Sequence, residues 1–82
     1  MSWNHRVLAT VEYHLNNEPE ICFSMHEVYY DKNGIPDRYT SEPIRISTDS
    51  MEGMKWILDR MQECLTKPVL WAGPKFPQEY EL

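Results

Sequence analysis

Apolar and polar side chains alternate along residues 3–13, which is the pattern of a half-buried β-strand. The odd positions carry the mostly apolar set, namely Trp3, His5, Val7, Ala9, Val11 and Tyr13. The even positions are mostly polar. Because successive side chains of a strand point to opposite faces, this period of two predicts one face toward a core and the other toward water.

A second strand is predicted over residues 20–30, with Ile21, Phe23 and Met25 on its odd face. A two-residue loop at 16–17 would pair odd positions with even ones and mix the two faces. A five-residue loop over 15–19 pairs odd with odd and keeps Pro19 out of the ladder. Since a slip of one residue inverts every side chain, we expect the longer loop.

The segment 31–34, Asp-Lys-Asn-Gly, is the strongest turn signal, because asparagine and glycine tolerate the positive φ of short hairpins. It predicts a third strand over 35–40 beside the second, with Arg38 near Glu27. Pro43 then interrupts the chain, and residues 44–47 are expected to form a short continuation or a fourth strand.

A single amphipathic helix is predicted near residues 50–66. Asp49 and Glu52 have the spacing of a capping box, and Pro68 ends the helix. Gly53 in the first turn costs about 1 kcal/mol relative to alanine. Apolar residues at spacings of three and four form one stripe, which consists of Met51, Met54, Ile57, Leu58, Met61 and Leu65.

These elements predict an α+β fold, an antiparallel meander of three or four strands with one C-terminal helix packed on one face. Residues 1–70 form the single domain, and residues 71–82 form an extended tail rich in proline and aromatic residues, docked or flexible. One helix of this length hides only part of the sheet, so Leu8, Val28 and Tyr30 are left on the opposite face. A symmetric homodimer is the simplest way to bury the remainder.

The 82 residues carry a net charge of −5, and the excess lies in the first hairpin. Between Val7 and Asp31 there are five acids and no lysine or arginine. This balance argues against direct binding to a nucleic-acid backbone. The candidate acidic surface is Glu12, Glu18 and Glu20. A solvated face is the simpler interpretation, and a surface for a basic partner is the alternative.

The candidate reactive groups are Cys22, Cys64 and the three histidines. Cys22 and His26 share a strand face but lie about 13 Å apart, too far to hold one metal ion. We expect no catalytic residue, metal or cofactor, and both thiols free. Cys22 is interpreted as a small buried hydrophobe and His5 as a packed imidazole, while His14 and His26 are predicted on the surface.

Aromatic residues exceed what a core under one helix needs. The candidate interface is Trp3, Tyr29, Tyr30, Tyr39, Trp71 and Phe76. Tryptophan and tyrosine are typical anchors of protein interfaces. The sequence thus favours a non-enzymatic protein-interaction module that self-associates. The alternative is a small acidic inhibitor of a basic nucleic-acid-handling protein. Without a long apolar run or a secretion signal, we expect no membrane contact and a cytoplasmic location.

Three short blocks resemble a group of short, uncharacterised bacterial proteins. They are the opening Trp3-Asn4-His5-Arg6-Val7, the block His26-Glu27-Val28-Tyr29-Tyr30-Asp31 with Gly34, and Lys67-Pro68-Val69-Leu70 after the helix. The resemblance covers about residues 3–70 and implies the same order of elements. It implies no activity, cofactor or site residue.

Overall fold

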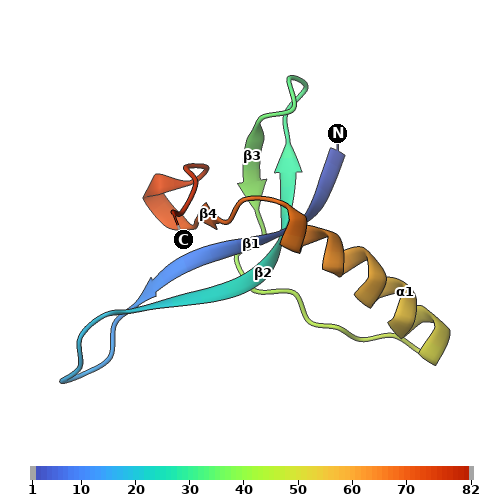
Figure 1. Ribbon diagram of the computed structural model, residues 1–82, viewed down its shortest axis with the longest axis horizontal. Coiled ribbons are helices and arrows are strands. Elements are labelled where there is room, and N and C mark those ends of the chain that lie inside the picture. Colours follow the sequence, from blue (N-terminus) through green and yellow to red (C-terminus); the bar gives the residue numbers. More distant parts are fainter. Residues whose placement is uncertain (1, 82) are drawn as a thin grey trace.

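The computed structural model describes residues 2–81, in which four strands form one sheet in the order β3-β2-β1-β4 (Figure 1). The strands are β1 (Ser2–Glu12), β2 (Glu20–Tyr30), β3 (Pro36–Tyr39) and β4 (Leu70–Trp71). A single α-helix, α1 (Met51–Gln62), precedes β4 in the chain. The α+β class is therefore confirmed.

The first two strands form a long antiparallel hairpin in which odd residues pair with odd residues, as predicted. Val7 lies opposite Met25, and Val11 lies opposite Ile21. The loop spans residues 13–19, two residues longer than expected, because pairing already ends at Glu12 and Glu20. Asn16 in this loop adopts a left-handed conformation, with φ of 65°. The faces were therefore predicted correctly and the loop length was not.

The turn between β2 and β3 forms as predicted around Asp31. Its Oδ1 accepts hydrogen bonds from the amides of Asn33 (2.9 Å) and Ile35 (3.0 Å), and Gly34 has φ of 77°. The register shifts at the end of β2, and Arg38 lies directly opposite Tyr29.

The fourth strand lies elsewhere in the chain than expected, and this makes the sheet mixed. Residues 44–47 form no strand, although the amide of Ile44 donates to the carbonyl of Met25 at 2.8 Å. The chain leaves the sheet there to reach the start of α1. The fourth strand is β4 instead, and it pairs parallel to β1 with Leu70 opposite Leu8. The prediction of a purely antiparallel meander is wrong on this point.

The helix begins one residue later than the predicted capping box. Ser50, not Asp49, is the N-cap, and its Oγ accepts a hydrogen bond from the amide of Gly53 at 2.9 Å. The α1 helix continues directly into a 3₁₀ turn, η1 (Glu63–Thr66), so that helical structure covers most of the predicted range.

Only the last turns of this helical segment are buried against the sheet. Met61 is 4% exposed and Cys64, in η1, is 1% exposed, whereas Met51 is 82% exposed. Leu65, which the predicted stripe included, is 71% exposed, and Cys64 takes its place. The first turns of α1 project from the sheet (Figure 1). The helix therefore covers less of the odd face than the periodicity predicted.

The deepest core lies on the even face of the hairpin, opposite the helix. Leu8 and Val28 are fully buried there, and Leu70 is nearly so. The side chains packed against them are Tyr30, Tyr39, Ala72 and Phe76. After β4, the short 3₁₀ turn η2 (Gly73–Lys75) carries the C-terminal segment over this face. The even face was predicted to be mostly polar, and the C-terminal segment supplies the apolar cover that it needs.

Two basic side chains are buried on the same even face, and each forms hydrogen bonds there, although the buried Nε of Arg6 has no partner. Arg6 donates to Tyr30 Oη at 2.9 Å and to the carbonyl of Pro68 at 2.7 Å. His26, predicted on the surface, is 4% exposed. Its Nδ1 lies 2.8 Å from the carbonyl of Thr40, which can only accept, so Nδ1 carries the proton. Strand alternation cannot reveal partners so distant in sequence.

The molecule has three arms, formed by the tip of the β1–β2 hairpin, the β2–β3 turn and the start of α1 (Figure 1). Its extents are 43 × 34 × 22 Å and its radius of gyration is 14.2 Å. A compact domain of this length has a radius of about 12 Å. The chain exposes 6393 Å², where a compact protein of its mass exposes about 5,200 Å². No helix within residues 2–81 has the length and apolar character to cross a membrane.

Candidate functional site

An apolar strip runs along the odd face of β2. Because alternate side chains of a strand share a face, Ile21, Phe23 and Met25 lie in one row. Phe23 is 51% exposed and Ile21 is 39% exposed. We call these three residues the β2 strip. Large apolar side chains this accessible, next to one another on a strand, form an exposed apolar patch rather than scattered exposure.

An aromatic group borders the strip toward β1 and β4. Phe23 lies opposite Ala9, and Ala9 lies opposite Trp71, so these residues form a row across three strands. The ring of Tyr80 packs edge-on to Phe23 at 5.4 Å and to Trp71 at 5.0 Å between centroids. Ala9 is fully buried in the middle of this row. The C-terminal segment thus packs against one side of the Phe23 ring, and the rest of the ring is exposed to solvent.

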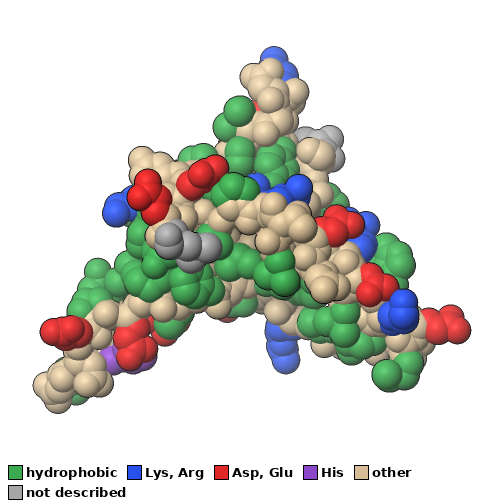
Figure 2. All heavy atoms as spheres, in the orientation of Figure 1, with side chains coloured by type: hydrophobic (Ala, Val, Ile, Leu, Met, Phe, Trp, Pro, Cys, Tyr) green, Lys and Arg blue, Asp and Glu red, His purple; other side chains and the backbone are tan. Residues whose placement is uncertain are grey.

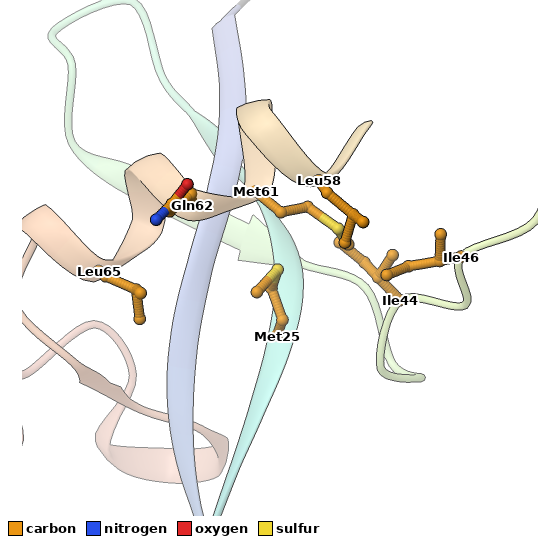
Figure 3. Close-up of a pocket in the computed structure, with 7 residues that line it drawn as sticks. All are labelled: Met25, Ile44, Ile46, Leu58, Met61, Gln62 and Leu65. Atoms are coloured by element: carbon orange, nitrogen blue, oxygen red, sulfur yellow. The ribbon is translucent and has the colours of Figure 1, made fainter. Parts of the chain in front are cut away.

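A groove continues the strip toward the helix. Met25 of the strip lies at its base, and Leu58 and Met61 of α1 point toward Ile44 (Figure 3). We call this the helix groove, with a volume of about 430 Å³ and a lining of Met25, Ile44, Ile46, Leu58, Met61, Gln62 and Leu65. Gln62 supplies the only polar side chain of this lining. Such a surface accepts apolar side chains and offers no group for acid–base chemistry.

A second aromatic group lies at the start of β1. The guanidinium of Arg60 lies 5.1 Å from the ring of Trp3 and 5.0 Å from that of Trp56. The ring of His5 meets Trp3 edge-on at 5.4 Å. Burial lowers the pKa of His5, and the nearby charge of Glu27 opposes this shift. The half-buried imidazole agrees with the predicted packed role of His5.

The predicted interface residues separate into two groups. Tyr30, Tyr39 and Phe76 lie in the even-face core, where Tyr39 Oη accepts from the amide of Gly73 at 2.6 Å. These side chains are partly buried in contacts within the chain itself.

The other three, Trp3, Tyr29 and Trp71, lie on the odd face by strand alternation. Tyr29 Oη donates to Glu27 Oε1 at 3.0 Å, and this bond is the main reason why the pKa of Tyr29 is raised. Trp71 contacts Lys75, whose ammonium lies 4.8 Å from the ring. Three of the six candidates therefore flank the apolar surface, and none of them belongs to the β2 strip.

The predicted acidic surface lies at the tip of the hairpin. Glu12 and Glu20 are directly opposite each other, and His14 Nε2 lies 3.9 Å from the first carboxylate and 3.7 Å from the second. Glu18 is exposed in the loop. Figure 2 shows acidic side chains and the histidine near the tip of this arm, with hydrophobic surface behind them. The three candidate acids thus lie together at the tip of the hairpin.

The two cysteines lie apart and are both free. Cys22 is half-buried rather than buried as predicted, because β3 ends before it reaches this part of β2. Desolvation, together with a hydrogen bond to Glu12, raises the pKa of Cys22. Burial likewise raises the pKa of Cys64. Within residues 2–81, no three histidine, cysteine or acidic side chains group in a way that could hold a metal ion.

The sequence interpretation missed the helix groove. The sequence predicts a short continuation or a fourth strand over residues 44–47 and places Leu58 in the apolar stripe of the helix, so neither prediction brings these residues together in a groove. The available signal was the excess of apolar residues over what one short helix and one hairpin can bury.

Searches of protein-family models, curated proteins and solved structures found no match to this chain. The resemblance to the group of short bacterial proteins therefore stays a prediction.

Proposed function

We propose that this chain is a non-enzymatic protein-interaction module that self-associates through its odd face. One observation carries the proposal: the chain exposes 6393 Å², about 1,200 Å² more than a compact protein of its mass. A standard interface removes about 800 Å² from each partner. The excess is therefore large enough to supply one interface.

The location of the exposed apolar side chains supports this proposal. Phe23, Ile21 and Leu58 are 39–51% exposed and belong to the β2 strip or the helix groove. Scattered apolar side chains are normal on a protein surface, but a contiguous apolar patch marks an interaction site.

The alternative function, an acidic inhibitor of a basic protein, has less support from the charges. Its candidate surface consists of Glu12, Glu18 and Glu20 on one hairpin tip, and His14 lies between two of them. Double-stranded DNA carries a charge about every 1.7 Å along its axis. Three carboxylates at one hairpin tip reproduce little of that pattern.

Sedimentation equilibrium of the full chain at 1–100 µM tests the proposal, with each concentration measured in about 50 mM and 500 mM NaCl. We expect a dimer whose Kd changes little between the two salts, because burial of apolar surface is not screened. A monomer at every concentration would refute self-association. Dimerisation that weakens steeply with salt would locate the contact in charged groups rather than in the apolar surface.

A further inference from the structure

The outer edge of β2 is open over residues 20–24. In this part of the strand β2 pairs with β1 on one side only, since β3 reaches only residues 28–30. The segment after β3 comes back to β2 as far as Met25 and then turns toward α1 (Figure 1). A strand edge with free backbone groups is a template for pairing with another strand.

The direction of the free groups follows from two hydrogen bonds. The carbonyls of Met25 and Glu27 accept from the amides of Ile44 and Thr40, which lie on the side away from β1. Backbone groups alternate in direction along a strand, so Ile21 and Phe23 also turn their N–H and C=O outward. These two residues therefore present two donors and two acceptors at the open edge.

We propose, as a specific form of the self-association proposed above and resting on it, that two copies of this chain pair antiparallel along this edge. The symmetry axis passes at Cys22. In this register Ile21 of each copy exchanges hydrogen bonds with Phe23 of the other, so both donors and both acceptors of each chain are used. Their side chains lie next to each other on the odd face, so each copy buries part of the other copy's β2 strip.

The neighbouring registers leave groups unused. An axis at Ile21 places Phe23 opposite Pro19, which has no N–H to donate. An axis at Phe23 places Ile21 opposite Met25, whose carbonyl already accepts from Ile44. Charge favours the same choice. With the axis at Cys22, Glu20 faces Ser24, and the two Glu20 side chains lie about 13 Å apart along the strands.

This register brings the two Cys22 residues together as a non-hydrogen-bonded pair. The Cα atoms of such a pair are about 4.5 Å apart, within the range that a disulfide spans. With the axis moved by one residue they are about 8 Å apart, outside that range. Cys22 is therefore a reporter of the register in the unmodified protein.

The first experiment is oxidative cross-linking of the dimer. Copper phenanthroline catalyses the reaction, in which two thiols lose their protons and pass two electrons to dissolved oxygen, and a non-reducing gel separates the products. The matched control combines Cys22→Ser with Ser24→Cys, whose new thiols lie about 13 Å apart in the proposed register. The rate of alkylation by iodoacetamide is measured for both proteins and corrects the cross-linking rates for any difference in reactivity between the thiols at positions 22 and 24. The buried Cys64 is kept in both proteins.

We expect the native chain to cross-link at least about tenfold faster than the control, because the control thiols lie beyond the span of a disulfide. Equal rates, or a faster control, would overturn the proposed register. A sedimentation dimer without the Cys22 cross-link would refute this edge and leave self-association standing. A sedimentation monomer would refute both.

The second experiment removes the outward donor. Ile21→Pro deletes an N–H that points away from β1, so it spares the hairpin ladder. Val11→Pro is the matched control, because Val11 lies directly opposite Ile21 and its N–H points to the other edge. We expect Ile21→Pro to raise the dimer Kd by at least about tenfold, since two symmetric hydrogen bonds are lost. Equal effects of the two prolines would contradict pairing along β2.

Discussion

Some residues do not follow the polar–apolar alternation of their strands, because residues far away in the sequence form hydrogen bonds with them. Arg6 occupies an even position that the pattern assigns to water, yet it is 7% exposed. Its two hydrogen bonds reach Tyr30 and Pro68, which lie 24 and 62 positions away in the chain. The apolar positions of β1 and β2 could be predicted from the sequence, but the burial of a charged side chain could not, because it depends on partners that only the tertiary fold brings near.

Arg6→Ala tests this network. The substitution leaves the carbonyl of Pro68 and the hydroxyl of Tyr30 without a buried donor, so we expect the free energy of unfolding to fall by about 2–4 kcal/mol. Urea unfolding at one fixed protein concentration measures the change, and Arg45→Ala, at an exposed position, is the control. A loss for Arg6→Ala no larger than that of the control would show that the network adds nothing to stability.

His5 makes stability depend on pH through its lowered pKa. A histidine whose pKa is lower in the folded state binds a proton more readily when unfolded. Its contribution to stability is therefore complete above pH 6.5, the value of the unfolded state, and is lost as the pH falls through that value toward the folded pKa. We expect the native chain to lose more stability than His5→Gln between pH 7.5 and pH 5.5.

Unfolding free energies of both proteins at the two pH values measure this difference, because the two proteins share every other side chain. An identical pH dependence in the two proteins would show that the environment of His5 does not disfavour its charged form.

At the scale of elements, the hairpin, the Asp31 turn and the helical segment were predictable, because each follows from a local pattern. The fourth strand was not. The short apolar run after Pro68 carries no periodicity, and Leu70 and Trp71 form a strand only because β1 offers them an edge. The helix groove escaped prediction for the same reason, since it requires Ile44 to lie against α1.

The start of α1 has a further contact that periodicity could not reveal. A Cβ at Gly53 would press on Thr48 Oγ1 and lie 3.0 Å from the capping Ser50 Oγ. Gly53→Ala alone should therefore give no gain in stability, even though alanine favours a helix by about 1 kcal/mol. In a Thr48→Ala background the same substitution should stabilise the protein by about 0.5–1 kcal/mol.

Thermal or urea unfolding of the four proteins of this double-mutant cycle measures the coupling between the two positions. If Gly53→Ala stabilises the native background as much as the Thr48→Ala background, the contact with Thr48 does not oppose a side chain at position 53.

At the scale of the whole molecule, the two faces of the hairpin are closed by different parts of the chain. Most of the C-terminal segment covers the even face, whereas the end of the helical segment and the ring of Tyr80 cover parts of the odd face. The sequence predicted that Leu8, Val28 and Tyr30 would lie opposite the helix and that Trp71 and the tail were available as cover. Which cover served which face could not be predicted, because both are apolar and the choice depends on the path of the chain after α1.

The parallel pairing of β1 with β4 also has a consequence for synthesis of the protein. The β1 strand obtains its last backbone partner from residues 70–72, which leave the ribosome long after it. A nascent chain that stops before this point leaves Leu8 and Val28 uncovered, so prematurely terminated products expose the future core and become substrates for chaperones and proteases. The four-stranded sheet can therefore form only after residues 70–72 have been synthesised.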